Sequence, residues 1–246
     1  MTVSAARSGK LPVLLSAAVV LAVLIGLGTW QVQRLVWKEA LLANIQQRIS
    51  SPPRSLSEIE AQLETTGDVD YVPVRLSGTF AHDSERFFFA TWEGKTGFYV
   101  YTPFRVTDGR YVFVNRGFVP YEMKDPGTRL QGQVSGQVHV TGLARNRLDE
   151  KPGKFVPDND VAKNIFYWKD LTAMEASANL PAESEVLPFF VDADQTPNPG
   201  GWPRGGVTMV DLPNNHLQYA VTWYGLAAAL ISVVGVWLNR QRAART

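Results

Sequence analysis

Two long apolar stretches, one near each end of the chain, restrict the fold more than any other feature of the sequence. Residues 11–27 and 217–238 contain no charged side chain. A helix of about 20 apolar residues spans the hydrocarbon core of a bilayer. We therefore expect transmembrane helices over 11–30 and 216–238. A cleaved signal peptide is the alternative for the first stretch, but no small-x-small cleavage pattern follows it, and a helical apolar pattern continues through 31–49.

Positively charged residues lie at the outer end of each apolar stretch. They are Arg7, Lys10, Arg240, Arg242 and Arg245. Because segments rich in Lys and Arg usually stay in the cytoplasm, we expect 1–10 and 239–246 to be cytoplasmic and 31–215 to lie on the opposite side. Arg34 and Lys38 argue against this assignment, because these positive charges closely follow the first stretch, on the side expected to be non-cytoplasmic.

Small residues recur every fourth position in both stretches. The first has Ala18, Ala22 and Gly26, and the second has Val221, Gly225 and Ala229. Small residues at this spacing allow two helix backbones to approach closely. The alternative is that both sets face lipid, since alanine and glycine are common in membrane spans.

Alternation of apolar and polar residues, with turn signals such as Asp108-Gly109, predicts a β domain between the two stretches. The expected strands cover 71–80, 86–91, 97–106, 111–115, 133–145, 165–168 and 186–192. Short helices are expected over 58–63, opened by Ser57, and over 170–178. The predicted fold is an α+β membrane protein in which N- and C-terminal transmembrane helices flank a mainly antiparallel β domain outside the membrane.

Composition excludes several classes of function. A net charge of +1 gives no electrostatic basis for nucleic-acid binding, and the absence of cysteine excludes disulfides and thiol catalysis. No phosphate-binding glycine loop or His-Glu-x-x-His motif is present. His82-Asp83-Ser84 contains the residue types of a hydrolase site, but neighbours on a strand point to opposite faces. With no visible acid–base pair, and His139 expected on the solvent face of its strand, we predict that the chain is not an enzyme.

His216 is the first residue of the second expected span. Pro213 rules out a helix arriving from upstream, and Asn214 and Asn215 can cap the helix that follows. The positive end of a helix and partial desolvation both favour a neutral imidazole here. A neutral imidazole with a free nitrogen is a ligand for haem iron or another metal. The alternative is an interfacial histidine that hydrogen-bonds a backbone carbonyl or a lipid headgroup.

Aromatic and basic residues gather where the first expected span ends. They are Trp30, Gln31, Arg34, Trp37 and Lys38, and Trp223 shares a helical face with His216. Arg34 and Lys38 could hold an anion such as a haem propionate, because a guanidinium donates two parallel hydrogen bonds to a carboxylate. Ordinary interfacial anchoring by Trp, Arg and Lys is the alternative. Met209 is a candidate second iron ligand, with ordinary packing as its alternative.

Asn115-Arg116-Gly117 is expected to form a turn after the strand 111–114. Gly117 suggests a backbone position that excludes a side chain. We expect Arg116 to brace the β domain, with a role in partner binding as the alternative.

Three motifs occur in order along the chain. They are Gly28-x-Trp30-Gln31-x-x-Arg34-x-x-Trp37-Lys38, Val114-Asn115-Arg116-Gly117-Phe118-Val119-Pro120 and Asn215-His216-Leu217-Gln218-Tyr219-Ala220-Val221-Thr222-Trp223-Tyr224. Together with the two apolar stretches, they resemble the surfeit locus protein 1 family. The resemblance implies an assembly factor for haem-copper cytochrome c oxidase, which binds haem a transiently and aids its insertion into oxidase subunit I. Haem a synthase is a second candidate partner, besides the lipid bilayer.

The same resemblance maps a histidine implicated as a haem a ligand onto His216. It also places Trp30, Gln31, Arg34 and Trp223 at family motif positions, and we assign them to cofactor binding. A membrane scaffold that stabilises subunit I without binding haem is the alternative function. No long Arg/Ser-rich presequence precedes the first span, which favours the bacterial inner membrane over the mitochondrial inner membrane.

Overall fold

The computed structural model of the chain describes residues 10–208, 210 and 213–244, which form two compact units. One unit combines the two ends of the chain, Met1–Asn44 and Asp211–Thr246, and the other is Ile45–Val210. Arg7, Arg245 and the candidate iron ligand Met209 lie outside the described residues.

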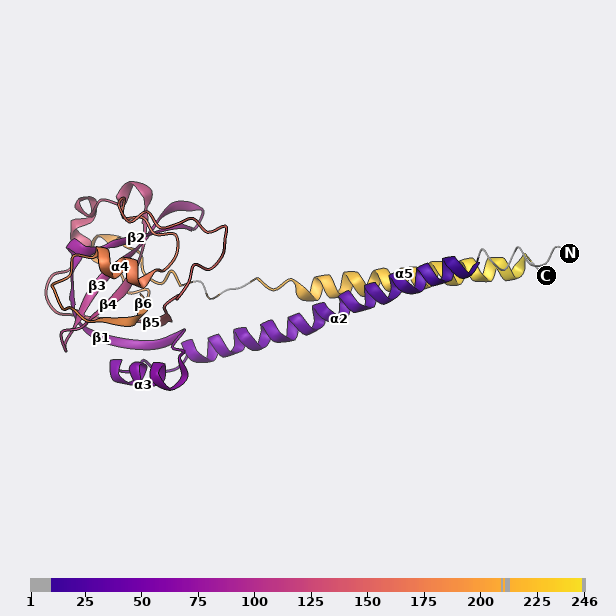
Figure 1. Cartoon of the computed structure of the whole chain (residues 1–246), viewed down its shortest axis with the longest axis horizontal. Coiled ribbons are helices and arrows are strands. Elements are labelled where there is room, and N and C mark those ends of the chain that lie inside the picture. Colours follow the sequence, from indigo (N-terminus) through magenta and orange to yellow (C-terminus); the bar gives the residue numbers. More distant parts are fainter. Residues whose placement is uncertain (1–9, 209, 211–212, 245–246) are drawn as a thin grey trace. The chain divides into compact units, whose positions relative to one another are not determined.

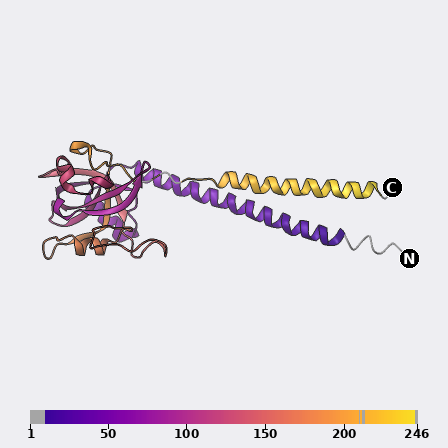
Figure 2. The same ribbon diagram turned by 90° about the horizontal axis from the view of Figure 1, so that it is seen from above.

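The helical unit contains α2 (Lys10–Ile49) up to Asn44 and α5 (His216–Ala243), which run antiparallel (Figures 1 and 2). No proline interrupts α2 after Pro12, and the helix ends just before Pro52 and Pro53. At about 1.5 Å per residue, its 40 residues extend about 60 Å, roughly twice the thickness of a bilayer's hydrocarbon core. Both helices are long and apolar enough to cross a membrane, which supports the expected membrane protein.

The contact between α2 and α5 does not use the small residues that the sequence singled out. Ala18, Ala22 and Gly26 are exposed, as are Val221, Gly225 and Ala229. The least exposed positions instead alternate in steps of three and four, the spacing of a coiled-coil seam. They are Leu21, Leu24, Gly28, Gln31 and Leu35 in α2, and His216, Ala220, Trp223, Ala227 and Leu230 in α5. The two small-residue sets therefore face away from the contact between α2 and α5.

The second unit is built on one six-stranded sheet. The strands are β1 (Val72–Phe80), β2 (Arg86–Trp92), β3 (Lys95–Val106), β4 (Tyr111–Pro120), β5 (Val138–Asn146) and β6 (Val186–Ala193). Their order is β1-β5-β6-β4-β3-β2, and all pairs are antiparallel except β4–β6. Because β1 also pairs with β3, five strands close into a ring and β2 extends it beside β3. The predicted fold class is confirmed.

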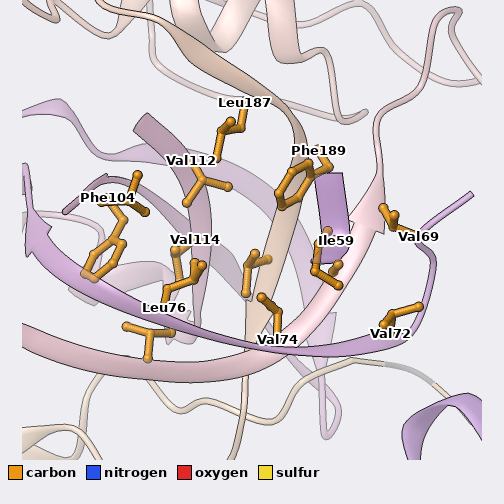
Figure 3. Packing of buried hydrophobic residues seen from close by; sticks show 14 residues of the cluster. Ile59, Val69, Val72, Val74, Leu76, Phe104, Val112, Val114, Leu187 and Phe189 are labelled. Atoms are coloured by element: carbon orange, nitrogen blue, oxygen red, sulfur yellow. The ribbon is translucent and has the colours of Figure 1, made fainter. Parts of the chain in front are cut away.

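The ring encloses the largest apolar cluster of the domain. Alternate residues of β1 and β4, such as Val74, Leu76, Val112 and Val114, point inward and meet Phe189 of β6 (Figure 3). Helix α3 (Leu56–Thr66) adds Ile59, which is fully buried in the same cluster. On another face, α4 (Leu171–Ser177) packs Leu171 and Met174 against Tyr101, Phe113 and Phe190. Both faces of β4 are covered, and all ten of its residues are buried.

The structure corrects several local predictions. Residues 165–168 make only isolated bridges, to Phe88 and Asp160, so they are not a ladder strand. Asn115-Arg116-Gly117 lies inside β4 and forms no turn, because the strand pairs on through Pro120. His82–Ser84 is the 3₁₀ helix η1 and not a strand segment. Ser55, not Ser57, caps α3, through a capping box with Glu58.

Three further 3₁₀ helices lie in the connections of the β domain. They are η2 (Tyr121–Met123), η3 (Pro126–Gly132) and η4 (Pro199–Gly201). Together, η2 and η3 carry the chain from the end of β4 toward β5, and η4 lies in the Pro- and Gly-rich segment that follows β6. They place Arg129 and Asn198 close to the Arg116 of β4, and Arg129 and Arg116 belong to the charge cluster described below.

Candidate functional site

His216 opens α5, and its position follows from the residues before it. The chain cannot continue a helix through Pro213, and Asn215 is the N-terminal boundary residue of α5. The side chain of Asn215 makes no capping bond, whereas Asn214 Oδ1 accepts a hydrogen bond from His216 N at 3.4 Å. The predicted capping is therefore carried by Asn214. The imidazole that results is half-buried at the first turn of the helix.

A hydrogen bond joins His216 to Gln31 on the other helix. His216 Nδ1 lies 2.7 Å from Gln31 Oε1, and Gln31 is buried with 9% of its surface exposed. An amide oxygen only accepts, so Nδ1 carries the proton and donates it. In the neutral imidazole Nε2 then holds a free lone pair, and none of the described residues forms a hydrogen bond with it. This arrangement, with one nitrogen held by a carbonyl and the other free, is typical of histidines that bind metals.

One turn before Gln31 in α2, the two helices approach closely at Gly28. A Cβ atom on Gly28 would lie 2.9 Å from the ring of Tyr224. The Tyr224 hydroxyl is 3.1 Å from Thr29 Oγ1, and Thr29 also donates to Ile25 O. Gly28 and Tyr224 belong to the sequence motifs, but no role was predicted for either residue. The pairing of a glycine with an aromatic residue on the opposite helix is the signal that could have found them.

The predicted anion-binding residues lie on α2 but do not contact His216. The Arg34 guanidinium stacks over the ring of Trp37 at 4.0 Å, and Arg34 is exposed. Among the described residues, no carboxylate lies within ion-pair distance of Arg34, so its donors are available. Lys38 Nζ instead donates to Pro213 O at 2.8 Å, which ties it to the segment just before α5.

The two predicted tryptophans have different environments. Trp30 is 54% exposed on the outside of α2, whereas Trp223 is half-buried along the seam with α2. The structure thus brings His216 and Gln31 together, keeps Trp223 on the same face of α5 as His216, and leaves Trp30 and Arg34 on the surface of α2.

The donor set suits a haem better than a bare metal ion. Within the described residues, no group of three or more His, Cys, Asp or Glu side chains is arranged to hold a metal. Haem supplies four nitrogen ligands of its own, so one protein imidazole is enough to attach its iron. His216 with its free Nε2 fits that requirement, and Arg34 has free donors for a carboxylate.

Sequence analysis missed a buried charge cluster in the β domain. Arg129 binds both oxygens of Glu85, at 3.2 and 2.5 Å, and Arg116 Nη1 lies 3.4 Å from Glu85 Oε1. All three side chains are at most 2% exposed. His82 is beside them, with Nδ1 3.3 Å from Arg116 Nη1. His139 is exposed, as expected, and among the described residues its side chain forms a hydrogen bond only with Ser77.

The cluster lowers the pKa values of both Glu85 and Arg116, for different physical reasons. Burial raises the pKa of Glu85, but its contacts with His82, Arg129 and Arg116 outweigh burial and leave that pKa below its usual range. Burial lowers the pKa of Arg116 to about 10, although the charge of Glu85 opposes this change. Glu85 and Arg116 are therefore both ionised at neutral pH.

Comparison with known proteins identifies the family. A model of the SURF1 family matches residues 18–228, a stretch that contains Gln31, His216 and the whole β domain. The chain belongs to the SURF1 family. It is 41% identical to human surfeit locus protein 1 over 222 residues, which cover 83% of this chain and 70% of the human protein.

Two other relatives agree with this assignment. Surfeit locus protein 1 of Rattus norvegicus is 39% identical over 220 residues, covering 83% of this chain and 68% of the rat protein. A SURF1-like protein of Monosiga brevicollis is 37% identical over 235 residues, covering 90% and 85%. Membership of the SURF1 family implies a role in cytochrome c oxidase assembly, and this family of assembly factors is generally not enzymatic.

Proposed function

We propose that this chain binds haem a transiently and aids its insertion into subunit I of cytochrome c oxidase. The observation that carries the proposal is the 2.7 Å hydrogen bond from His216 Nδ1 to Gln31 Oε1. Gln31 fixes both the tautomer and the orientation of the imidazole, so Nε2 is prepared to ligate iron before the haem arrives. Haem a is cargo in this proposal, and the chain changes no covalent bond of it.

Each proposed binding residue has one task. His216 Nε2 ligates the iron, and Gln31 holds the ring. Arg34 binds a propionate, since its guanidinium lies over the Trp37 ring, 4.0 Å from the ring centre, and its N–H groups have no acceptor among the described residues. Trp223 and Trp30 offer aromatic surfaces to the macrocycle from α5 and α2. A single imidazole bond can be exchanged for a ligand of the receiving subunit, which a carrier requires.

A direct test compares haem content in three proteins purified from cells that make haem a. His216→Ala removes the iron ligand but leaves the helix start intact, so it should accumulate normally and copurify with at least about tenfold less haem a. His139→Ala is the matched control, because His139 is an exposed histidine of the β domain. Haem content equal to wild type in His216→Ala, at equal protein, would remove the ligand role.

Gln31→Leu is the second variant, since it keeps side-chain volume but removes the oxygen that orients His216. Removal of such a supporting partner typically weakens metal binding about 10- to 100-fold. A wild-type absorption spectrum and affinity in Gln31→Leu would show that the imidazole needs no orientation by this residue.

A scaffold that stabilises subunit I without haem is the second candidate function. The observation that favours it is that the His216–Gln31 and Lys38–Pro213 bonds also tie α2 to the start of α5. Under this function, His216→Ala would reduce protein stability and oxidase yield together, with no haem in either protein.

We propose the inner membrane of a bacterium as the location, with the mitochondrial inner membrane as the alternative. Among the described residues, Lys10 lies at the outer end of α2, and Arg240 and Arg242 lie in the last turns of α5. Their charges support cytoplasmic ends and a periplasmic β domain. Proposed partners are subunit I, haem a synthase and the surrounding lipid.

A further inference from the structure

The start of α5 is held only weakly by its own sequence. Asn215, the boundary residue of the helix, makes no side-chain capping bond, and the bond from His216 N to Asn214 Oδ1 is long, at 3.4 Å. Side-chain caps normally fix the first turn of a helix, because they satisfy N–H groups that have no partner within it. A contact from outside α5 is therefore needed to fix the backbone that carries His216.

Lys38 of α2 supplies such a contact. Its Nζ donates to Pro213 O at 2.8 Å, and this carbonyl lies three residues before His216. Within the described part of the chain, the ammonium group of Lys38 makes no ion pair and no other hydrogen bond. The proline ring limits rotation of the backbone at position 213, so a bond to its carbonyl also restricts the direction in which the chain enters α5.

Lys38 and Gln31 act on the same short segment from the same face of α2. They are seven residues apart, which is close to two full turns of an α-helix. Gln31 Oε1 accepts from His216 Nδ1 at 2.7 Å and so holds the ring, while Lys38 holds the backbone just upstream. One hydrogen bond to the ring leaves the backbone free to move, whereas two contacts from one helix fix both the position and the direction of the imidazole.

We propose that Lys38 is a positioning residue for His216 and acts through Pro213 O. This inference rests on the proposed haem function and extends it. In this role Lys38 contacts neither the iron nor the macrocycle, and it keeps His216 Nε2 where the iron can reach it. The alternative role is a direct bond from Lys38 to a haem propionate, which would persist in the absence of His216.

A double-mutant cycle separates the two roles. Full-length protein in lipid nanodiscs is titrated with haemin, an iron porphyrin that carries propionates. Lys38→Met removes the donor and keeps the length of the side chain, and it should weaken binding about tenfold, as loss of a partner that orients a metal ligand does. In a His216→Ala background the same substitution should have no further effect, because no ligand remains to be positioned. An equal loss in both backgrounds would overturn the proposal and assign Lys38 to a propionate.

Two further variants complete this series. Lys38→Arg keeps N–H donors for Pro213 O and should restore most of the affinity that Lys38→Met loses. Glu39→Met is the matched control, because Glu39 is the exposed neighbour of Lys38 on α2, and it should bind haemin as wild type does. A loss in Glu39→Met equal to that in Lys38→Met would overturn the proposal.

A second measurement needs no haem. Nuclear magnetic resonance of ¹⁵N-labelled histidine in the haem-free protein shows which ring nitrogen carries the proton, and the chain contains only three histidines. Wild type should show the Nδ1-protonated tautomer at His216, and Lys38→Met should show a mixture of both tautomers. An unchanged tautomer in Lys38→Met would overturn the proposal. If the tautomer responds in this way but wild type binds no haemin, the positioning role stands and the proposed haem function fails.

Discussion

At the scale of single residues, Glu85 shows how the β domain stabilises charges that are buried in its interior. Its carboxylate is 2% exposed and accepts from Arg129 at 2.5 Å, while Arg116 Nη1 lies 3.4 Å away. Loss of this single carboxylate would leave two guanidinium groups buried without a counter-charge, which is more damaging than loss of a surface ion pair.

Glu85→Gln should therefore lower the free energy of unfolding by about 3–5 kcal/mol at neutral pH. Because the pKa of Glu85 in the folded protein is below its ordinary value of 4.5, the stabilisation is complete above that value and is lost as the pH falls through the lower folded pKa. Denaturant unfolding of the full chain in detergent, at several pH values, measures the difference between variant and wild type. That difference should be constant above pH 4.5 and shrink below it.

Glu122→Gln serves as the control for this comparison, since Glu122 is exposed. It should change stability by less than about 0.5 kcal/mol at every pH. A difference between Glu85→Gln and wild type that stays constant into strong acid would contradict the role assigned to Glu85.

Single residues also show where sequence reasoning stops. Pro213 and the apolar run after it predict where His216 lies, because they fix a helix start. The partner of its ring, Gln31, is 185 positions away, and no local pattern links the two. Likewise, Arg129 and Glu85 are 44 positions apart, and neither side chain looks unusual in its own segment. Contacts of this kind depend on tertiary packing.

At the scale of elements, the packing of α2 against α5 depends on the seam residues, which recur in steps of three and four. It does not depend on the small residues spaced four apart. The predicted sets at four-residue intervals lie on exposed faces, while Gly28, Ala220 and Ala227 are the small residues that are buried. A four-residue repeat in an apolar helix contains no information on which face meets a partner. Glycine matters at position 28 because the Tyr224 ring lies against it.

Gly28→Leu should lower the stability of the helix pair by about 1–3 kcal/mol, since even a Cβ would lie 2.9 Å from the Tyr224 ring. Gly26→Leu is the matched control: the substitution is identical, and nothing lies within 4 Å of a Cβ at that position. The stability of both variants is measured by titrating the detergent-solubilised protein with dodecyl sulfate and monitoring unfolding by tryptophan fluorescence. Equal losses of stability in the two variants would contradict the assignment of Gly28 to the contact between α2 and α5.

The sequence predicted some strands correctly and others only in part. Alternation works for β1, in which Val74, Leu76 and Gly78 are buried while the residues between them are more exposed. It was wrong for 165–168, where an apolar run packs Phe166 into the core beside α4 without joining the ladder. It also ended β4 too early, since a strand buried on both faces has no alternation to follow.

At the scale of the whole molecule, the β domain contains its own core. All three buried apolar clusters draw their members from Ile45–Val210. We expect a fragment of residues 45–210, without the two membrane helices, to fold alone and to unfold cooperatively on heating. Circular dichroism measures the secondary structure of the fragment, and calorimetry measures its thermal unfolding. A fragment with no cooperative transition would show that the helices are needed to complete the domain.

Membrane topology is a second prediction at this scale. Alkaline phosphatase fused after residue 150, in the exposed segment between β5 and α4, should be active if the β domain is periplasmic. A fusion after Arg242, beyond the apolar part of α5, is the control and should be inactive. Stable but inactive enzyme at the first position would reverse the proposed orientation.

The position of β6 in the sheet has a consequence for biosynthesis. Although it is the last strand to leave the ribosome, it lies between β4 and β5, which were made earlier. Until residue 193 has emerged, β4 and β5 each have one unpaired edge and the ring cannot close. The newly synthesised domain therefore exposes two unpaired strand edges until β6 has been made. Unpaired edges pair readily with wrong strands, so the domain needs protection during this period.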